Sequence, residues 1–420
     1  MRVLIVNTSE RIGGAAIAAA RLMEALNNNG VKAKMLVRDK QTDHVAVIPL
    51  DKSWKLALKF VWERVCIWKA NHFHKHKLFE VDLANVGTDI TALPEFRDAD
   101  VIHLHWVNQG YLSLQDIERI AQSGKPVVWT MHDMWPFTGI CHYSGECSRY
   151  QRTCHHCPLL YSGGHKTDIS NAVFARKQHL FQQAKFFFVA CSQWLEAMAR
   201  QSSLLAGQPV CNIPNAINTN LFHPMDKVAA RRKYNLPLDK KLLLFGSLKI
   251  TDKRKGVDYL IEACRWIQEK YPDLRSDVAI VTMGKAGADT AKLFSFPVYN
   301  LDYVSAERDL VDVYNAVDLY VTPSLQDNLP NTIVEAMACG VPCVGFNVGG
   351  IPQMIDHLHN GYVAEYKNAQ DFANGIHWAL VEDDYDTLSE MAARKAQLTY
   401  SESTVAKRYI EVYNKAIGHE

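Results

Sequence analysis

Two carboxylates in the C-terminal half of the chain have a spacing that suits the binding of neighbouring hydroxyl groups. They are Asp327 and Glu335, in the segment SLQDNLPNTIVEAMACGVP at residues 324–342. Asp327 falls in a loop after the apolar run 319–322, and Glu335 falls about one turn into the helix expected next. A carboxylate can accept two hydrogen bonds at once, which suits the hydroxyls of a ribose or a hexose. The alternative is that Glu335 only complements the helix dipole.

A group of cations precedes this segment in the sequence. The stretch FGSLKITDKRKG at 245–256 follows an apolar run and leads into a helical pattern. Its candidate ligands for a phosphate are Ser247, Lys249, Arg254 and Lys255. Cations beside a helix N-terminus form a site suited to a diphosphate. A solvated basic turn is the alternative interpretation.

A pair of glycines opens the first helical pattern of the chain. Gly13 and Gly14 follow the apolar run 3–7 and would let a ligand approach the backbone closely. The segment lacks the G-x-G-x-x-G fingerprint of dinucleotide-binding enzymes, which argues against a dehydrogenase. By itself the pair indicates little more than a tight turn.

Polar residues end two further apolar runs in the N-terminal half. His132 and Asp133 follow the run 127–131, while His105 and Trp106 follow the run 101–104. Ligands of open α/β sheets bind beyond the carboxyl ends of the strands, so these positions face a potential ligand. Asp133 could set the tautomer of His132 or shape an acceptor site. A purely structural histidine is the alternative.

Four cysteines lie within seventeen positions of each other, directly after His132. They are Cys141, Cys147, Cys154 and Cys157. The C-x2-C half of this pattern is typical of a zinc knuckle, whereas the wider first half is less so. The sequence therefore predicts a structural zinc site here, with reduced structural cysteines or a redox pair as the alternatives.

Short apolar runs that alternate with helical patterns must position all of these residues. Runs that are apolar along their whole length predict strands buried on both faces of a parallel sheet. In the N-terminal half we expect strands at 3–7, 34–37, 101–104, 127–131 and 186–190, and a helix at 15–26. In the C-terminal half we expect strands at 242–245, 278–283, 319–322 and 341–346, and helices at 257–269, 310–317 and 332–338. Two such series predict two doubly wound α/β domains.

Length and charge agree with this division. At roughly 150 residues per domain, 420 residues predict two or three domains. We expect domains at 1–215 and 216–399, divided near the loop 214–224, with a final helix at about 400–420 that packs back on the first domain.

The net charge of +1 gives no reason to expect nucleic acid as a partner. Neither a membrane span nor a signal peptide is indicated, so we expect a cytoplasmic protein.

One segment of the first domain has a pattern of its own. Residues 53–77 carry large apolar side chains at helical spacing, with lysines and an arginine at other positions. The apolar set is Trp54, Leu58, Val61, Trp62, Val65 and Trp68. Such a helix could lie peripherally on anionic lipid at the inner face of a membrane. The alternative is an ordinary amphipathic helix that packs this face on the domain.

The segment 323–342 strongly resembles the C-terminal signature of the retaining family-4 glycosyltransferases, which have the GT-B fold. In that family two acids, separated by seven residues, precede an Ala-Met-Ala-x-Gly-x-Pro motif. The resemblance extends over nearly the whole chain and includes segments 213–222 and 348–352 and a final helix at 405–416. It implies two Rossmann-like domains whose parallel sheets face each other across a cleft.

The resemblance also implies roles for single residues. Glu335 would bind the ribose of a nucleotide, and Asp327, where the family more often has Glu, would lie by the hydroxyls of the donor sugar. Lys255 matches the family's diphosphate-binding lysine, whereas Ser247 stands where an arginine is usual, so Arg254 or Lys249 would supply the second charge. Four more positions would contact the donor: Gly13, Gly14 and the backbone of Asn328 and Leu329. His132 would contact the donor sugar, and His105, Trp106 and Asp133 would line the acceptor side.

The resemblance therefore implies transfer of a hexose-type sugar from a nucleotide diphosphate to a glycan or lipid-linked acceptor in surface polysaccharide, lipopolysaccharide or capsule synthesis. Configuration would be retained by front-face attack. The cations would replace a metal at the diphosphate, so no cofactor would be required for catalysis. A sugar-nucleotide epimerase or phosphorylase with the same fold, or a catalytically silent binding module, are the alternatives.

Overall fold

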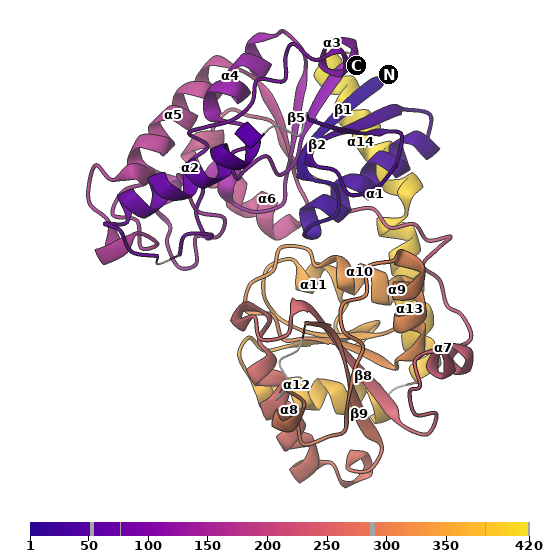
Figure 1. The fold of residues 1–420 in the computed structure, drawn as a ribbon. Helices are drawn as coiled ribbons and strands as arrows, with labels where there is room; N and C mark the ends of the chain where they lie inside the picture. The colour runs from indigo at the N-terminus through magenta and orange to yellow at the C-terminus, as the bar shows by residue number, and fades with distance from the viewer. Residues whose placement is uncertain (51–53, 76, 286–289, 383, 419–420) are drawn as a thin grey trace. The chain divides into compact units, whose positions relative to one another are not determined.

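The computed structural model of the chain describes residues 1–50, 54–75, 77–285, 290–382 and 384–418, and these residues form two compact units. Unit 1 comprises Met1–Ala216 and Val405–Glu420, and unit 2 comprises Ile217–Thr404. Each unit has its own parallel sheet (Figure 1). Each also has its own hydrophobic core.

The sheet of unit 1 contains seven strands in the described residues, in the order β3-β2-β1-β4-β5-β6-β7. Every neighbouring pair in it is parallel. The order reverses between β1 and β4, which makes this the topological switch point of the sheet. The strands are β1 (Arg2–Ser9), β2 (Lys32–Asp39), β3 (Val47–Pro49), β4 (Val101–Leu104), β5 (Val127–Met131), β6 (Phe186–Ala190) and β7 (Val210–Asn212).

Helices cover both faces of this sheet, because its central strands are apolar on both sides. The strands β4 and β5 are buried at every position. The helices of unit 1 are α1 (Gly14–Asn28), α2 (Trp54–Ala70), α3 (Pro94–Asp98), α4 (Leu114–Gln122), α5 (Ile169–Gln183), α6 (Gln193–Arg200) and α14 (Glu402–Ile417). Helix α14 returns from unit 2 and packs on unit 1 through Val405, Ala406, Tyr409 and Tyr413.

The sheet of unit 2 contains six parallel strands in the described residues, in the order β10-β9-β8-β11-β12-β13. Its switch point lies between β8 and β11. The strands are β8 (Lys241–Lys249), β9 (Val278–Lys285), β10 (Val298–Asn300), β11 (Leu319–Thr322), β12 (Cys343–Phe346) and β13 (Gly361–Ala364). The helices are α7 (Lys227–Lys233), α8 (Val257–Lys270), α9 (Glu307–Ala316), α10 (Asn331–Ala338), α11 (Ile351–Met354), α12 (Ala369–His377) and α13 (Tyr385–Lys395).

The two parallel sheets confirm the predicted fold class, and every strand and helix expected in the two series is present, some with the predicted ends and others with ends shifted by a few residues. Four short strands were not predicted: β3, β7, β10 and β13. All four are edge strands: β3 and β7 are the two edges of the first sheet, and β10 and β13 are the two edges of the second. Because edge strands are short and half exposed, they lack the continuous apolar runs that reveal central strands.

Helix α2 is present in the predicted segment 53–77, of which residues 53 and 76 lie outside the described part of the chain. It packs on unit 1 through Leu56, Glu63, Arg64 and Ile67. The expected apolar face points the other way, because Trp54 is 70% exposed and Trp62 is 57% exposed. The helix is therefore packed on the first domain, but through a face other than the predicted apolar one. No helix in the described residues is long and apolar enough to cross a membrane.

Candidate active site

An ion pair joins the ends of the two strands that flank the switch point of unit 2. Lys255 follows β8, Asp327 follows β11, and their side chains meet with Lys255 Nζ 2.6 Å from Asp327 Oδ2. The Ser324 hydroxyl donates to the same carboxylate oxygen at 3.3 Å. The side chains of Lys255 and Asp327 stay 29% and 15% exposed, so a ligand can reach both charges.

Close backbone contacts hold these two loops together. Gly256 has a φ of 70°, and a Cβ there would lie 1.9 Å from the carbonyl oxygen of Pro323. Gly349 has a φ of 57°, and a Cβ there would lie 1.7 Å from the carbonyl oxygen of Asp327. The amide of Leu325 donates to the carbonyl of Arg254 at 2.7 Å. Only glycine fits at positions 256 and 349, and the Lys255–Asp327 pair depends on that fit.

Glu335 lies deeper than Asp327. It sits in the second turn of α10, is only 5% exposed, and accepts a hydrogen bond of 2.7 Å from the Tyr314 hydroxyl on α9. Burial, followed by the charge of Glu335, raises the pKa of Tyr314 well above its ordinary value, so the tyrosine remains a donor. No pattern in the sequence indicated Tyr314, since a tyrosine on a predicted helix is ordinarily a packing residue.

The other predicted donor residues of unit 2 occupy distinct positions. Arg254 is directed at Asp252, with Arg254 Nη2 2.9 Å from Asp252 Oδ2 and the arginine side chain 60% exposed. Burial opposes ionisation of Asp252, but the hydrogen bonds from Arg254 hold its pKa below the ordinary value. Lys249 is exposed, and the Ser247 hydroxyl donates to its carbonyl at 3.0 Å. Asn328 and Leu329 are buried just before α10.

In unit 1, His132 lies at the carboxyl end of β5 and is backed by a second histidine. His132 Nε2 is 2.9 Å from Nδ1 of His105, and its Nδ1 is 3.5 Å from Cys191 Sγ. Burial lowers the pKa of His132 to about 4, although Asp133 acts in the opposite direction. His105 is only 3% exposed, so it supports His132 from behind and is remote from solvent.

Asp133 is the centre of a second network in unit 1. It accepts hydrogen bonds from the Trp106 indole at 2.9 Å and from the Trp135 amide at 2.8 Å. It also pairs with His142 at 2.7 Å, and the other nitrogen of that ring lies 2.6 Å from Asp82. Burial opposes protonation of His142, but the two carboxylates raise its pKa to about 10, so the ring is positively charged at neutral pH.

Sequence reasoning missed Asp82 and assigned no role to His142. No local pattern around Asp82 distinguishes it, because its partners come from positions 64 and 142. Trp106 and His132 remain partly exposed, while Asp133 and His105 are buried. The network therefore holds the rings of Trp106 and His132 in place after β4 and β5, with the buried Asp133 and His105 behind them.

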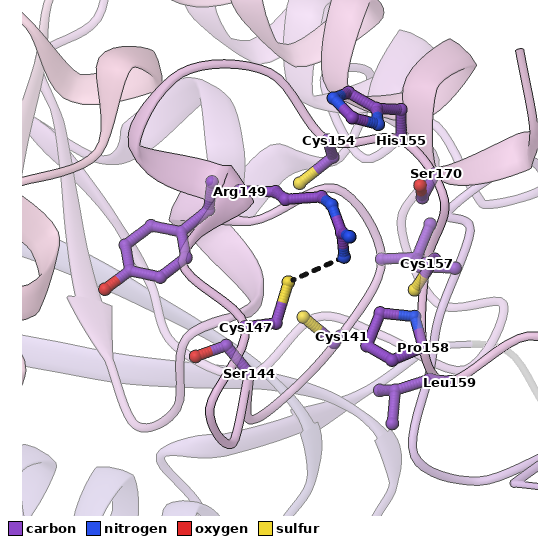
Figure 2. Close-up of a pocket in the computed structure, with 12 residues that line it drawn as sticks. Cys141, Ser144, Cys147, Arg149, Cys154, His155, Cys157, Pro158, Leu159 and Ser170 are labelled. Carbon is purple, nitrogen blue, oxygen red and sulfur yellow. Dashed lines mark hydrogen bonds between the residues drawn. The ribbon is translucent and has the colours of Figure 1, made fainter. Parts of the chain in front are cut away.

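The two remaining groups of predicted residues also lie in unit 1. Gly13 and Gly14 are exposed at the N-terminus of α1, where Gly13 accepts hydrogen bonds from the amides of Ala16 and Ile17. The four clustered cysteines line a single pocket, together with His155 and Arg149 (Figure 2).

Two doubly wound parallel sheets, one with a cation–carboxylate pair at its switch point, define an α/β protein of the GT-B class of transferases. The family model described as Glycosyltransferase Family 4 matches residues 12–221, and that described as Glycosyl transferases group 1 matches residues 239–382. The chain belongs to the family-4 glycosyltransferases, as its resemblance predicted.

Individual known proteins agree with this assignment. The chain is 27% identical to a D-inositol 3-phosphate glycosyltransferase of Corynebacterium aurimucosum, over 77% of this chain and 73% of the relative. It is 28% identical to the enzyme of the same name from Thermobispora bispora, where the match spans only 49% of the relative's length and 48% of this chain. It is 26% identical to the N,N'-diacetylbacillosaminyl-diphospho-undecaprenol alpha-1,3-N-acetylgalactosaminyltransferase of Campylobacter jejuni, over 50% of this chain and 55% of that protein.

Among solved structures, the sucrose-phosphate synthase of Thermosynechococcus elongatus matches all of this chain and all of its own, with a TM-score of 0.68. Its sequence identity of 18% makes this a likeness of fold. The same two-sheet architecture is thus shared with a much more distant GT-B enzyme.

Proposed function

We propose that the protein transfers a hexose-type sugar, with retention of configuration, from a nucleotide diphosphate to a glycan or lipid-linked acceptor in surface polysaccharide synthesis. The observation that carries this proposal is the partly exposed Lys255–Asp327 pair at the switch point of unit 2. Ligands of such sheets bind at this point. Family membership supports the transferase chemistry.

In this proposal the leaving diphosphate takes over the ammonium group of Lys255. The negative charge that develops as the sugar departs is stabilised there, and Arg254 or Lys249 supplies a second cation in the role that a metal ion has elsewhere. Arg254 has to leave Asp252 to do so, which its 60% exposed side chain permits. Asp327, released from Lys255, accepts hydrogen bonds from the hydroxyls of the donor sugar.

Glu335 is proposed to bind the ribose of the nucleotide. The hydrogen bond from Tyr314 holds its carboxylate in one orientation, so less conformational entropy is lost when the ribose hydroxyls bind. The backbone before α10, at Asn328 and Leu329, offers helix N-terminal amides to the donor. No protein nucleophile is assigned, because retention is proposed to proceed by front-face attack.

In unit 1 we assign His132 to the transferred sugar and Trp106 with Asp133 to the acceptor, while Gly13 and Gly14 offer the N-terminus of α1 to phosphate. The network behind these residues preorganises them, because Asp133 is fixed by hydrogen bonds from Trp106, Trp135 and His142. An aromatic ring beside a carboxylate is a common combination for a sugar, whose faces are apolar and whose edges are polar.

A lipid-linked acceptor is favoured by the surface of α2. Its outward face exposes Trp54, Leu58, Val61, Trp62, Val65 and Trp68. The lysines Lys55 and Lys69 are exposed on the same helix. Exposed apolar residues with neighbouring cations suit the interface of an anionic membrane, so the enzyme is proposed to lie peripherally on its inner face. The name of the Campylobacter jejuni relative specifies an undecaprenol-linked sugar, which supports an acceptor of this kind.

The test is a thermal-shift screen of nucleoside diphosphates and nucleotide sugars on wild type and on Glu335→Gln. Glutamine keeps the shape of the side chain and can still accept from Tyr314, so the fold is preserved. A ligand at about 100 times its Kd stabilises the folded protein by about 2.7 kcal/mol. We expect one nucleotide to raise the Tm of wild type but not of Glu335→Gln. If every nucleotide leaves the Tm of the folded wild type unchanged at millimolar concentration, the proposal is wrong.

A further inference from the structure

The four clustered cysteines come together around one small cavity. Cys141, Cys147, Cys154 and Cys157 all line it, and its volume is about 20 Å³ (Figure 2). A cavity of about 10–15 Å³ or more holds one water-sized particle, so this one has room for a single ion and little else. The cavity lies in unit 1 and uses none of the residues assigned above to donor or acceptor.

Most of the residues that line the cavity belong to a long segment that has little regular structure. Residues 132–168 connect β5 to α5 and contain only three single-turn helices in the described chain. Segments of this length without their own secondary structure are uncommon in compact domains and are ordinarily functional. This segment also carries His132, Asp133 and His142, so whatever fixes its path fixes the strand-end network.

Backbone contacts already bring the cysteines to the cavity. Cys141 forms an isolated antiparallel bridge with Val81. The amide of Cys157 donates to Asp168 at 2.9 Å, and a Cβ on Gly139 would lie only 3.3 Å from Cys154 Sγ. The positions of Cys141 and Cys157 are therefore set by backbone contacts and do not depend on a side-chain rotamer, and Gly139 lies against Cys154.

The charges around the cavity suit a cluster of thiolates. Its lining contains no aspartate or glutamate, but Arg149 Nη1 donates to Cys147 Sγ at 3.7 Å. Lys177 is fully buried close by, with its ammonium donating to the carbonyls of Trp135 and Thr138 at 2.5 and 3.0 Å. Buried charges need opposite charges nearby. One Zn²⁺ with four thiolates has a net charge of −2, which these two cations would offset, while Asp168 beside the Cys157 amide adds one negative charge to the surroundings.

His155 gives a further indication of a polar occupant. It lines the same cavity, and its Nδ1 atom is buried without a hydrogen-bond partner. Buried polar atoms in native proteins nearly always have a partner, so such an atom requires an explanation. An ion or its bound thiolates beside the ring would provide one.

We infer that Cys141, Cys147, Cys154 and Cys157 bind one structural Zn²⁺ as thiolates, with release of their four protons. Four sulfur ligands in a closed tetrahedral set are typical of structural zinc. As the side chains are oriented, no three His, Cys, Asp or Glu groups in the described residues surround one point closely enough to hold a metal. Binding therefore requires the thiols to change rotamer and turn into the cavity.

The test measures zinc in the full-length protein by mass spectrometry of the metal. We expect about one zinc per chain after purification without added metal. The double variant Cys154→Ser/Cys157→Ser should lose it. The control Cys264→Ser/Cys343→Ser replaces two buried cysteines of unit 2 and should retain it. Glu335→Gln should also retain it, because the inference does not rest on the proposed transferase activity.

A second measurement on wild type avoids dependence on the folding of the variants. Reduced protein loaded with Co²⁺ should show the absorption of tetrahedral cobalt thiolate, and a mercurial reagent that blocks thiols should abolish it. Two results would overturn the inference. One is reduced wild type that retains neither zinc nor cobalt after desalting, and the other is a disulfide between two of the four cysteines in protein purified under reducing conditions.

Discussion

The two units place polar groups at the same edge of similar sheets but expose them very differently. In unit 2, the charged pair Lys255–Asp327 remains accessible and has few partners besides itself. In unit 1, His103, His105 and Asp133 are buried and connected to other buried groups. We infer that unit 2 is built to exchange an internal ion pair for a charged ligand, whereas unit 1 holds a rigid surface in position.

The largest effect is expected from a substitution in unit 2 that removes Lys255, which is proposed to exchange Asp327 for the diphosphate. Lys255→Ala removes the cation assigned to the departing diphosphate, and loss of one such group typically lowers kcat by about 10²–10³-fold. Lys253→Ala is the matched control, because this neighbouring lysine is exposed in the same turn. The measurement is the rate of transfer or donor hydrolysis with the nucleotide sugar found in the thermal-shift screen. Equal losses in both variants would show that only the local positive field matters.

The second prediction concerns the histidines of unit 1 and the dependence of the free energy of unfolding on pH. Burial lowers the pKa of His103 to about 3 and that of His132 to about 4, and it also lowers the pKa of His105. Unfolded histidines have a pKa of about 6.5, so below this pH the unfolded chain binds more protons than the folded one. The contribution of these three histidines to stability is therefore fully present above about pH 6.5 and falls as the pH is lowered toward 4, by about 1.4 kcal/mol per pH unit for each histidine. His142, whose pKa is raised to about 10, contributes with the opposite sign, and its share declines above about pH 6.5.

Denaturant unfolding of wild type and His132→Gln between pH 4.5 and about 7.5 measures this slope. The groups that face His132 are His105, Cys191 and Asp133, and burial lowers the pKa of His105 as well. We expect the free energy of unfolding of the variant to depend less steeply on pH, by about 1.4 kcal/mol per pH unit, because one buried histidine is removed. A wild-type stability that is flat with pH across this range would contradict the buried, neutral histidines.

A third prediction sharpens the account of Glu335. Tyr314→Phe removes the hydroxyl that donates to this buried carboxylate, and a hydrogen bond to a charged group contributes about 1.5–3 kcal/mol. We expect the donor KM to rise by about tenfold with a smaller change in kcat, because orientation of the ribose ligand is lost. The control is Tyr320→Phe, whose hydroxyl donates to Thr332 instead. Similar KM values for the two variants would argue that Glu335 does not contact the donor.

The smallest effect on stability is expected on α2. Trp54→Ser and Trp62→Ser alter side chains that are 70% and 57% exposed, and exposed substitutions usually change stability by no more than about 0.5 kcal/mol. Binding to vesicles that contain anionic lipid should nevertheless weaken markedly in the double variant. Leu398→Ser, at a 63% exposed residue of unit 2, is the control. Unchanged sedimentation with vesicles would remove the proposed membrane contact and leave the transferase proposal intact.

Prediction from sequence worked best where a pattern is local. The buried runs 101–104 and 127–131 coincide with β4 and β5, because central parallel strands are apolar on both faces. It failed for β7 and β13, which are short edge strands. Prediction from sequence also failed to identify which face of α2 packs on unit 1. The helix buries Glu63 and Arg64 because Glu63 accepts from the amides of Leu83 and Ala84 and Arg64 pairs with Asp82. Those partners lie about twenty positions further along the chain, where helical periodicity carries no information.

By itself the sequence determined the two parallel sheets, the family, and the residue types available for chemistry, since these follow from short apolar runs and from motifs contiguous in the chain. Only the tertiary structure decided which of those residues meet. Lys255 and Asp327 are separated by 72 positions, and Asp82 and His142 by 60, yet each pair is in direct contact. The physical reason is that a parallel sheet brings the ends of distant strands to one edge, and the close backbone approach at Gly256 then sets which side chains touch.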